Sequence, residues 1–336
     1  MNMWWLLPAC AVIALLLTGA LRQYALVRSL IDVPNARSSH AVPTPRGGGV
    51  SIVVSFLAAL MFAASMGAVA WPITWALLGA GIGIAVLGFM DDHGHIVARW
   101  RLLGHFIAAS WALYYVGGLP PLAIFGFVFD LGWFGHVLAA FYLVWLLNLY
   151  NFMDGIDGIA SVEAICTCLS AALLYWLTGN GALALLPLLL GFAVSGFLYW
   201  NFPAARIFMG DAGSGFLGIT LGVLSLQAAC AAPQLLWSWL ILLGVFIVDA
   251  TWTLFRRLLR GDKVYEAHRS HAYQFASRQY KKHLPVTLTV GAINLAWLLP
   301  IAILVTSGYL DGLLGVLIAY TPLALLAVKF NAGAKE

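Results

Sequence analysis

Long apolar runs alternate with short polar stretches along the whole chain. About eleven of these runs are long enough, or nearly so, to cross a hydrocarbon core, which takes about 20 residues of helix. The expected spans are residues 3–21, 48–67, 73–90, 102–117, 134–150, 159–178, 181–200, 213–231, 234–254, 285–306 and 311–330. The pattern predicts an all-α integral membrane protein, a single polytopic domain over residues 1–336.

The polar stretches predict the orientation of the bundle. With eleven spans, all 17 Lys and Arg residues fall on one side, and such a bias marks the cytoplasmic side. The N-terminus is then periplasmic. The expected cytoplasmic loops are residues 22–47, 91–101, 150–158, 201–212 and 255–284. On the other side, the Gly- and aromatic-rich residues 122–133 could form a small periplasmic hairpin.

Composition agrees with a membrane protein. The chain is 62% hydrophobic and only 9% charged, whereas soluble domains carry roughly 25% charged residues. The four cysteines lie in apolar runs, which favours small core residues over a zinc site or a disulfide framework. The first apolar run lacks a basic segment before it and a convincing cleavage site, so we expect a retained span. No nucleic-acid partner is expected.

One stretch between two apolar runs concentrates oxygen-bearing side chains. Asn148, Asn151, Asp154 and Asp157 recur every three residues before and within an Asp-Gly-Ile-Asp-Gly turn. Carboxylates near hydrocarbon are costly unless they are paired, hydrated or bound to a cation, and oxygen ligands suit Mg²⁺. The alternative is an ordinary helix end and turn, in which Asn and Asp before Gly are common.

Three further acids stand at the ends of apolar runs. Asp91 and Asp92 are adjacent, so at a partly dry site they need a metal or a basic partner. Such a carboxylate could take a proton from a nucleophile; the alternative is a solvated helix end. Asp211 precedes another run, where it could cap the helix or hold a metal beside phosphates.

Basic residues on the same side suggest anion binding. Arg46 precedes three glycines, an arrangement that can cradle phosphate or simply form a turn. His268 and His271 are three residues apart, so a helix would place them on one face, and with Arg269 they could hold an anion. The alternative is a solvated basic loop. Two acids within spans, Glu163 and Asp249, have no assigned role.

Taken together, these motifs resemble the polyprenyl-phosphate N-acetylhexosamine-1-phosphate transferases. That family includes the bacterial enzymes that start O-antigen, enterobacterial common antigen and teichoic acid, and the peptidoglycan translocase MraY. The resemblance covers about residues 32–283. It is carried by Pro43-Thr44-Pro45-Arg46-x-Gly48-Gly49, Asp91-Asp92, Asn148-x-x-Asn151-x-x-Asp154-Gly155-Ile156-Asp157-Gly158, Phe208-Met209-Gly210-Asp211-x-Gly213-Ser214 and His268-x-x-His271.

The resemblance implies a bundle of ten or eleven spans with a cytoplasmic cleft, placed in the bacterial inner membrane. It implies transfer of a sugar-1-phosphate from a UDP-N-acetylhexosamine to undecaprenyl phosphate, with release of UMP and with Mg²⁺, for which Mn²⁺ could substitute. Site roles follow by motif position. The metal ligands would be Asn151 and Asp211, the catalytic residues Asp91, Asp92 and Asp154, and the substrate-binding residues Arg46, Asn148, Asp157, His268, Arg269 and His271.

Two departures from the family pattern refine the expectation. Position 95 is His where the family usually has an acid, and Ser270 replaces the middle His of a His-x-His-His motif. The second change points to the O-antigen-initiating branch of lipopolysaccharide biosynthesis rather than to MraY. The sugars expected there are N-acetylglucosamine and its 6-deoxy relatives N-acetylfucosamine and N-acetylquinovosamine. A homodimer is compatible with the resemblance.

Two other classes of function remain open at this point. A transporter or flippase of a phosphorylated lipid or sugar would also carry Gly-interrupted apolar segments and intramembrane acids. It predicts charges near the midplane and repeated halves, whereas the charges here gather at the inner ends. A non-catalytic membrane subunit would have no need of several acids and amides on separate inner loops.

Overall fold

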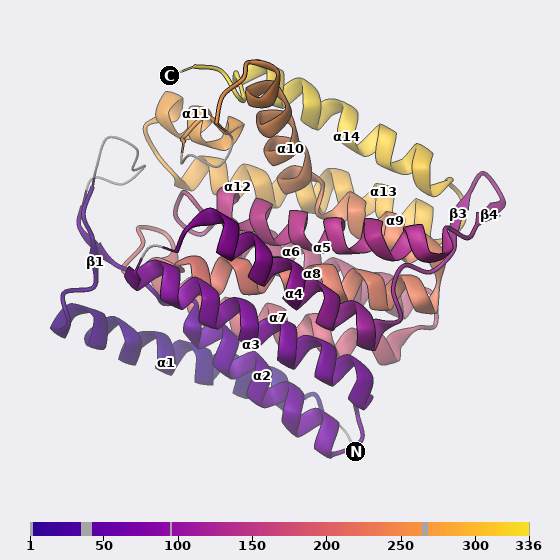
Figure 1. Ribbon diagram of the computed structural model, residues 1–336, viewed down its shortest axis with the longest axis horizontal. Helices are drawn as coiled ribbons and strands as arrows, with labels where there is room; N and C mark the ends of the chain where they lie inside the picture. The colour runs from indigo at the N-terminus through magenta and orange to yellow at the C-terminus, as the bar shows by residue number, and fades with distance from the viewer. Residues whose placement is uncertain (1–2, 35–41, 95, 264–267, 336) are drawn as a thin grey trace.

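The protein is described by a computed structural model that covers residues 3–34, 42–94, 96–263 and 268–335, almost entirely as helices (Figure 1). The α-helices are α1 (Leu6–Val27), α2 (Val50–Ser65), α3 (Trp71–Gly94), α4 (Ala98–Val116), α5 (Gly132–Met153), α6 (Ile159–Leu177), α7 (Leu185–Asn201), α8 (Asp211–Ala231), α9 (Pro233–Leu242), α10 (Gly244–Leu259), α11 (Ala272–Tyr280), α12 (Leu284–Ile293), α13 (Leu299–Thr306) and α14 (Gly312–Lys329). A 3-10 turn, η1 (Gly181–Ala184), leads into α7, and a π-helical turn, η2 (Asn294–Leu298), joins α12 to α13.

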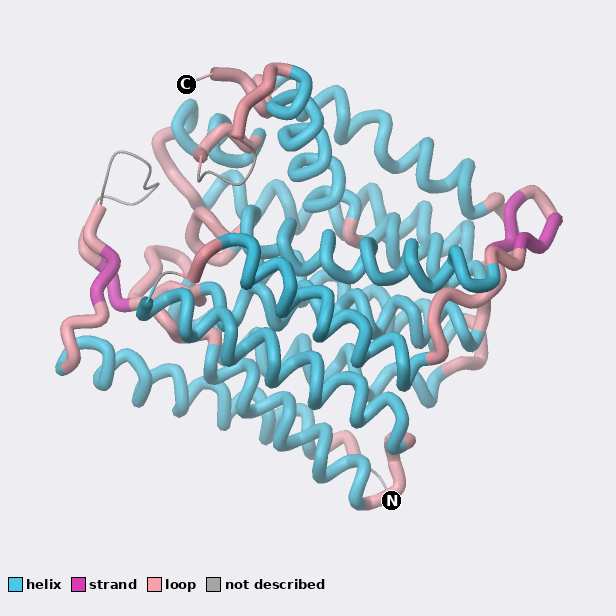
Figure 2. The backbone as a smooth tube through the Cα atoms, viewed as in Figure 1, coloured by secondary structure: helices cyan, strands magenta, loops and turns pink. Residues whose placement is uncertain are grey.

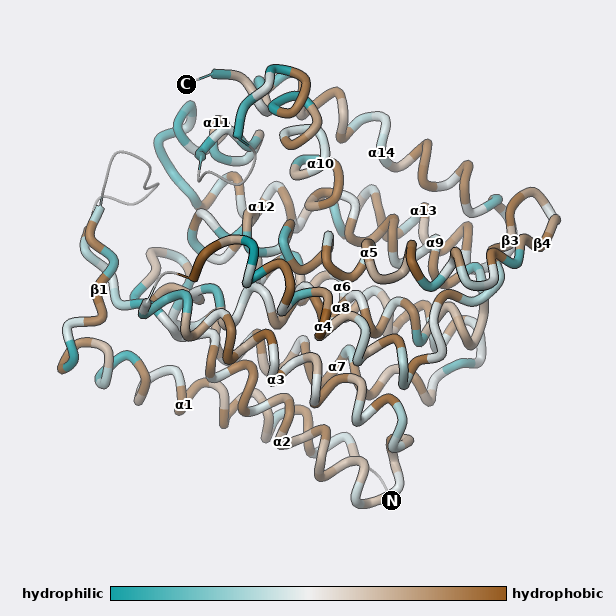
Figure 3. Tube along the Cα trace, in the orientation of Figure 1, coloured by the Kyte–Doolittle hydropathy of each residue, from teal (hydrophilic) through white to brown (hydrophobic). Residues whose placement is uncertain are grey.

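Most helices run along the long axis of the molecule, and the short strands lie at its two ends (Figure 2). At one end β1 (Ile31–Asp32) pairs with β2 (Thr44–Pro45), at the same end of the molecule as α11 and the C-terminus. At the other end β3 (Leu122–Ile124) and β4 (Phe127–Phe129) form an antiparallel hairpin. This confirms the hairpin predicted within residues 122–133. The hydrophilic stretches gather mainly at the end that carries β1 and α11 (Figure 3).

The helix lengths confirm a multi-pass membrane protein but not the count of eleven spans. Among the described residues, eight helices are long and apolar enough to cross a membrane, or nine if the bent pair α9–α10 is one span. Every expected range is largely helical. The expected range 48–67 contains α2, which has 16 residues and is short for a span. The expected range 102–117 contains α4, which is not among the eight.

One expected span is not a straight helix. Residues 234–254 were expected to cross as one segment, but the helix breaks at Leu243, and α10 is bent by 70° from α9. Figure 1 shows α10 standing steeply against its neighbours. The helices also reach further into the expected loops than predicted, because α3 continues to Gly94 and α5 to Met153. The last turns of these helices therefore carry several of the acids and amides.

Helix α8 forms the centre of the bundle, packed against α3 and α5. Close approach of these helices depends on glycine, as is usual between membrane helices. A Cβ atom on Gly218 of α8 would lie 2.6 Å from the Leu146 carbonyl oxygen of α5. A Cβ atom on Gly88 of α3 would lie 2.5 Å from the carbonyl carbon of Asp211. The glycines thus bring the polar ends of α3, α5 and α8 together.

Candidate active site

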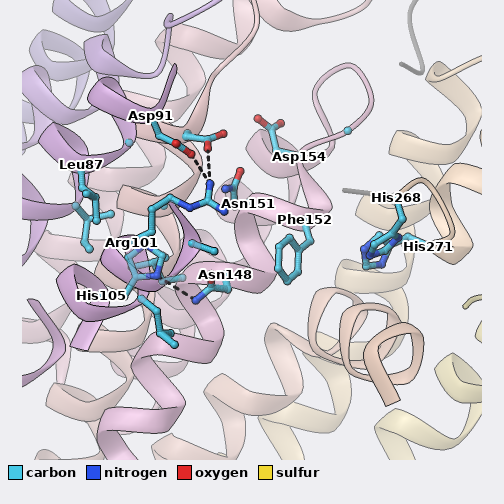
Figure 4. A pocket seen from close by; sticks show the side chains of 18 of the residues that line it. Leu87, Asp91, Arg101, His105, Asn148, Asn151, Phe152, Asp154, His268 and His271 are labelled. Atoms are coloured by element: carbon cyan, nitrogen blue, oxygen red, sulfur yellow. Dashed lines mark hydrogen bonds and ion pairs between the residues drawn. The ribbon is translucent and has the colours of Figure 1, made fainter. Parts of the chain in front are cut away.

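A cavity of about 460 Å³ opens where the polar ends of α3, α4, α5 and α8 meet the N-terminal end of α11 (Figure 4). Seven of the eleven predicted site residues line it, from four separate segments of the chain. They are Asp91, Asn148, Asn151, Asp154, Asp211, His268 and His271. The predicted residues Arg46, Asp92, Asp157 and Arg269 do not line it.

Asp91 and Asp211 face the same cation, Arg101 of α4. The Arg101 guanidinium hydrogen-bonds the Asp91 carboxylate (Figure 4). Its Nη1 also lies 3.9 Å from Asp211 Oδ2. The Asp91 side chain is 7% exposed and the Asp211 side chain 33%. Sequence reasoning assigned no role to Arg101. Its position ten residues after Asp91, on the next helix, gave no local signal of the contact.

Asp92 lies behind the cavity and stabilises the start of α8. Its Oδ2 accepts a hydrogen bond of 3.1 Å from the backbone N–H of Asp211, the first residue of that helix. A carboxylate there complements the positive end of the helix dipole. Arg46 approaches Asp92 from the other side, with 3.8 Å between Nη1 and Oδ1, and also donates to the Asp92 carbonyl. Asp91 therefore pairs with Arg101, and Asp92 pairs with Arg46.

Two of the three glycines after Arg46 use their N–H groups within the protein. The N–H groups of Gly48 and Gly49 donate to the carbonyls of Phe208 and Met209, both at 2.9 Å. A Cβ atom on Gly49 would also lie 2.5 Å from Gly213 Cα. These two amides are therefore not available to a phosphate, and the two glycines permit close packing before α8.

The amides of α5 carry hydrogen bonds from neighbouring helices. Asn151 Oδ1 accepts from Ser214 Oγ of α8 at 3.1 Å, and the Asn151 amide also contacts the Asp211 carboxylate. Asn148 Nδ2 lies 3.3 Å from His105 Nδ1 of α4 (Figure 4). His105 lines the cavity and was not predicted. One turn of α5 thus presents two amides to the same space as Asp211.

Asp154 follows α5 directly and faces the cavity with its carboxylate uncompensated. The carboxylate forms no hydrogen bond or ion pair with the described part of the chain. Burial first, and then the negative charges of Asp211, Asp92 and Asp157, together raise the pKa of Asp154 to about 7. A bound cation would relieve this unfavourable charge.

Asp157 instead stabilises the loops beside the cavity. Its Oδ2 accepts from the Ala205 backbone N–H at 3.0 Å, and its Oδ1 lies 3.1 Å from His283 Nδ1. The Thr287 hydroxyl of α12 donates to the Asp157 carbonyl at 2.8 Å. Asp157 therefore links the loops after α5 and α7 to the start of α12.

The N-terminal end of α11 forms the wall of the cavity across from Asp91 and Arg101 (Figure 4). His271 precedes this helix and its Nδ1 lies 3.3 Å from Asp249 Oδ1 of α10. The same carboxylate accepts from the backbone N–H groups of Ala272 at 2.9 Å and Tyr273 at 3.0 Å. Asp249, to which sequence reasoning gave no role, thus caps α11 and orients His271.

Flat rings line this wall. The rings of Phe152 and His271 lie 6.4 Å apart and nearly parallel, and those of His271 and His268 lie 4.9 Å apart. The Tyr273 hydroxyl donates to the Phe152 carbonyl at 3.0 Å, which ties the wall to the end of α5. Burial, with His271 and Arg257 nearby, lowers the pKa of His268 to about 3. His268 is therefore neutral at pH 7 and can accept a hydrogen bond.

The remaining expectations fall at the edge of the site. Arg269 is half-buried, and its carbonyl accepts from Arg278 Nη1 at 2.9 Å. Ser270, in place of the expected middle His, has its hydroxyl 2.9 Å from His268 Nδ1. The departure at position 95 lies outside the described residues.

The donor set fits a hard divalent cation completed by ligands from a substrate. Within the described ranges, no three His, Cys, Asp or Glu side chains are grouped to hold a metal ion. The cavity nevertheless combines the Asp211 carboxylate, the Asn151 amide and the uncompensated Asp154 carboxylate. Mg²⁺ commonly takes only one or two carboxylates and completes its shell with water and phosphate oxygens.

These observations define an integral membrane protein of many helices, with an acidic cavity where the polar ends of its helices converge. Comparison with known proteins identifies the group to which it belongs. The sequence model of Glycosyl transferase family 4 matches residues 74–229, which include Asp91, Asn151 and Asp211. The chain belongs to this family.

Three relatives illustrate the range of the similarity. The chain is 30% identical over 266 residues to the probable undecaprenyl-phosphate N-acetylglucosaminyl 1-phosphate transferase of Bacillus subtilis, an alignment of 77% of this chain and 73% of the relative. It is 29% identical to the decaprenyl-phosphate N-acetylglucosaminephosphotransferase of Mycolicibacterium smegmatis, over 84% of this chain and 78% of the relative. It is 31% identical to the phospho-N-acetylmuramoyl-pentapeptide-transferase of Streptococcus thermophilus, over 66% and 67%.

Proposed function

We propose that the protein transfers an N-acetylhexosamine-1-phosphate from a UDP-sugar to undecaprenyl phosphate. In this reaction a phosphate oxygen of the lipid bonds to the phosphorus that carries the sugar. The bond from that phosphorus to the bridging diphosphate oxygen breaks, and UMP leaves. The observation that carries the proposal is the single cavity in which Asp91, Asn151 and Asp211 meet, in a family whose relatives are named as such transferases.

The residues of the cavity divide the work of such a transfer. Asn151 and Asp211, with Asp154 beside them, would hold Mg²⁺, or Mn²⁺ in its place. The metal would supply charge neutralisation for the diphosphate and for the leaving UMP. Arg101 lies between Asp91 and Asp211 and is placed to bind a phosphate oxygen. Asp91 is then the candidate base toward the lipid phosphate.

The opposite wall suits the nucleoside. Phe152 is 37% exposed and presents an apolar ring to the cavity beside His271. A flat base can stack on such a surface, and stacking on an aromatic side chain is worth about 1–3 kcal/mol per base. His268, neutral at pH 7, can accept a hydrogen bond from a sugar hydroxyl or amide.

Membrane side and pathway complete the proposal. The Lys and Arg bias favours a cavity that faces the cytoplasm of a bacterial inner membrane, where UDP-sugars are available. The substitution of Ser270 in the His motif favours initiation of lipopolysaccharide O-antigen or a related lipid-linked glycan. The sugar we propose is N-acetylglucosamine or a 6-deoxy relative.

One assay tests the activity and separates it from transport. Purified protein is incubated with undecaprenyl phosphate, Mg²⁺ and a panel of UDP-N-acetylhexosamines, and UMP release and the lipid product are measured. UMP and lipid-diphosphate-sugar formed in equal amounts support the proposal, and the preferred sugar identifies the branch. If the wild type releases no UMP with any sugar of the panel, and Asp91→Asn gives the same result in this assay, an enzymatic role is rejected and a transporter is favoured.

A further inference from the structure

A buried face of α6 lies against both helix ends at the break between α9 and α10. A helix end leaves carbonyl and N–H groups without intrahelical partners, and in a membrane such groups must be satisfied within the protein. Thr167 of α6 donates from its hydroxyl to the carbonyl of Leu242, the last residue of α9, at 3.4 Å. Four residues earlier, the Glu163 carboxylate faces the backbone N–H of Phe246, in the first turn of α10, and its Oε1 has no hydrogen-bond partner among the described residues.

The four-residue spacing of Glu163 and Thr167 allows α6 to face both the end of α9 and the start of α10. Residues four apart lie on the same face of a helix, one turn above the other. Glu163 is fully buried and Thr167 is 1% exposed, so this face is closed to lipid and water. It presents an acceptor to the N-terminal end of α10 and a donor to the C-terminal end of α9, which is the polarity that each end requires.

A further helical segment contacts Glu163. Asn294 Nδ2 donates to Glu163 Oε2 at 2.6 Å, and Asn294 is the first residue of the π-helical turn η2. Single π-turns within membrane-length helices are often functional features. Glu163 therefore links α6 to η2 and faces the start of α10 at one buried point, in a span where an acid is costly to keep.

The position of α10 is transmitted directly to the cavity. Asp249 lies three residues after Phe246, on the next turn of α10, and its carboxylate caps α11 and contacts His271. A change in the bend at Leu243 would move Asp249, and with it the α11 wall and His271. Glu163 does not line the cavity, so its effect has to pass through α10.

We propose that Glu163 is a positioning residue that, with Thr167, sets the bend of α10 and thereby the α11 wall of the cavity. The functional part of this inference rests on the proposed transferase activity. The proposed control of the α10 bend does not depend on that activity, so an experiment can reject either proposal without rejecting the other.

The direct test measures the bend. Spin labels at Leu259 of α10 and Val27 of α1, which are 72% and 82% exposed, are placed in a background with the four native cysteines replaced by alanine. Glu163→Leu removes the hydrogen bond from Asn294 and the acceptor that faces α10, at similar volume, and Thr167→Val removes the hydrogen bond to the Leu242 carbonyl. Each should shift or broaden the distance distribution. Glu163→Gln, which keeps an acceptor, should leave it unchanged.

The matched control is Ser170→Ala. Ser170 is a buried polar residue of the same helix, 2% exposed, whose hydroxyl has no hydrogen-bond partner in the described chain. It should behave as wild type. In transferase assays Glu163→Leu should raise KM for the UDP-sugar by about tenfold with a smaller change in KM for the polyprenyl phosphate, because the α11 wall faces the nucleotide.

The outcomes are distinct. An unchanged distance distribution in both Glu163→Leu and Thr167→Val overturns the proposal, as does Glu163→Gln when it is as disturbed as Glu163→Leu. If Glu163→Leu does not fold, Thr167→Val and Glu163→Gln decide by the same distances. If the wild type releases no UMP while the distances shift as expected, the transferase proposal fails and the proposed control of the α10 bend stands.

Discussion

Replacing Asp154 by Asn should stabilise the metal-free protein, and the gain should grow with pH. The pKa of the Asp154 carboxyl is raised from 3.8 to about 7, by burial first and then by Asp211, Asp92 and Asp157. Raising a pKa from 3.8 to about 7 corresponds to ~4 kcal/mol between the two protonation states. Because the side chain keeps contact with the solvent in the cavity, the real cost of ionising it should be smaller, ~1–3 kcal/mol.

The sign follows from proton binding. Between about pH 4 and pH 7 the folded protein holds the Asp154 proton while the unfolded chain has lost it, so stability falls as the pH rises through this window. Above the folded pKa of about 7 the full cost is present and no longer changes. Asn carries no charge in either state. The advantage of Asp154→Asn should therefore be near zero at about pH 4 and largest at about pH 8.

The assay is thermal unfolding of the purified protein in detergent, from pH 5 to pH 8, first with chelator and then with excess Mg²⁺. Mg²⁺ should narrow the gap by stabilising the wild type more than the variant, since the cation relieves the charge that Asn lacks. The control is Asp130→Asn, an exposed acid at the hairpin end whose Oδ1 accepts only from Gly132 N–H within the described residues. A pH-independent gain for Asp154→Asn, or an equal trend for Asp130→Asn, would refute the reasoning.

Three further predictions concern activity. Asp211→Asn and Asn151→Ala should each abolish UMP release while the protein still inserts into membranes, and turnover by either purified variant would remove the metal assignment. Asp91→Asn should lower kcat by at least about 100-fold, whereas Asp130→Asn should leave it unchanged; equal effects would argue against a base at Asp91. Phe152→Ala should raise KM for the UDP-sugar by about 5–100-fold and Phe152→Tyr should not, as steady-state kinetics would show.

The bundle was largely predictable because hydropathy acts locally. Apolar runs long enough to cross a membrane must be helical, since no other open structure satisfies its backbone there. The sequence could not show that the run 234–254 bends at Leu243, because the side chains that face the bend, Glu163 and Thr167, lie some 80 residues away in the chain. The β1–β2 pair was missed because each strand has only two residues.

The sequence was sufficient to predict the acids and amides of the site, but it did not reveal the residues of other helices that contact the site. Asn151, Asp154 and Asp211 stand in motifs whose Asp and Gly content is unusual between apolar runs. Arg101 and Asp249 do not, because each acts on a residue of another helix and nothing in their own neighbourhood marks them. Long-range pairing of this kind is a property of the packed bundle.

The charge balance around the cavity shows why these partners matter. Four carboxylates, those of Asp91, Asp92, Asp154 and Asp211, are offset by two guanidiniums, those of Arg46 and Arg101. Each arginine contacts Asp91 or Asp92, and Arg101 reaches Asp211 only at 3.9 Å. The excess negative charge thus lies at Asp154 and Asp211, beside the Asn151 amide. A divalent cation placed there would be held by charge and would leave the N–H groups of Arg101 that do not bind Asp91 available to a phosphate. Metal and diphosphate should therefore bind cooperatively, which Mg²⁺-dependent UDP-sugar binding by calorimetry would measure.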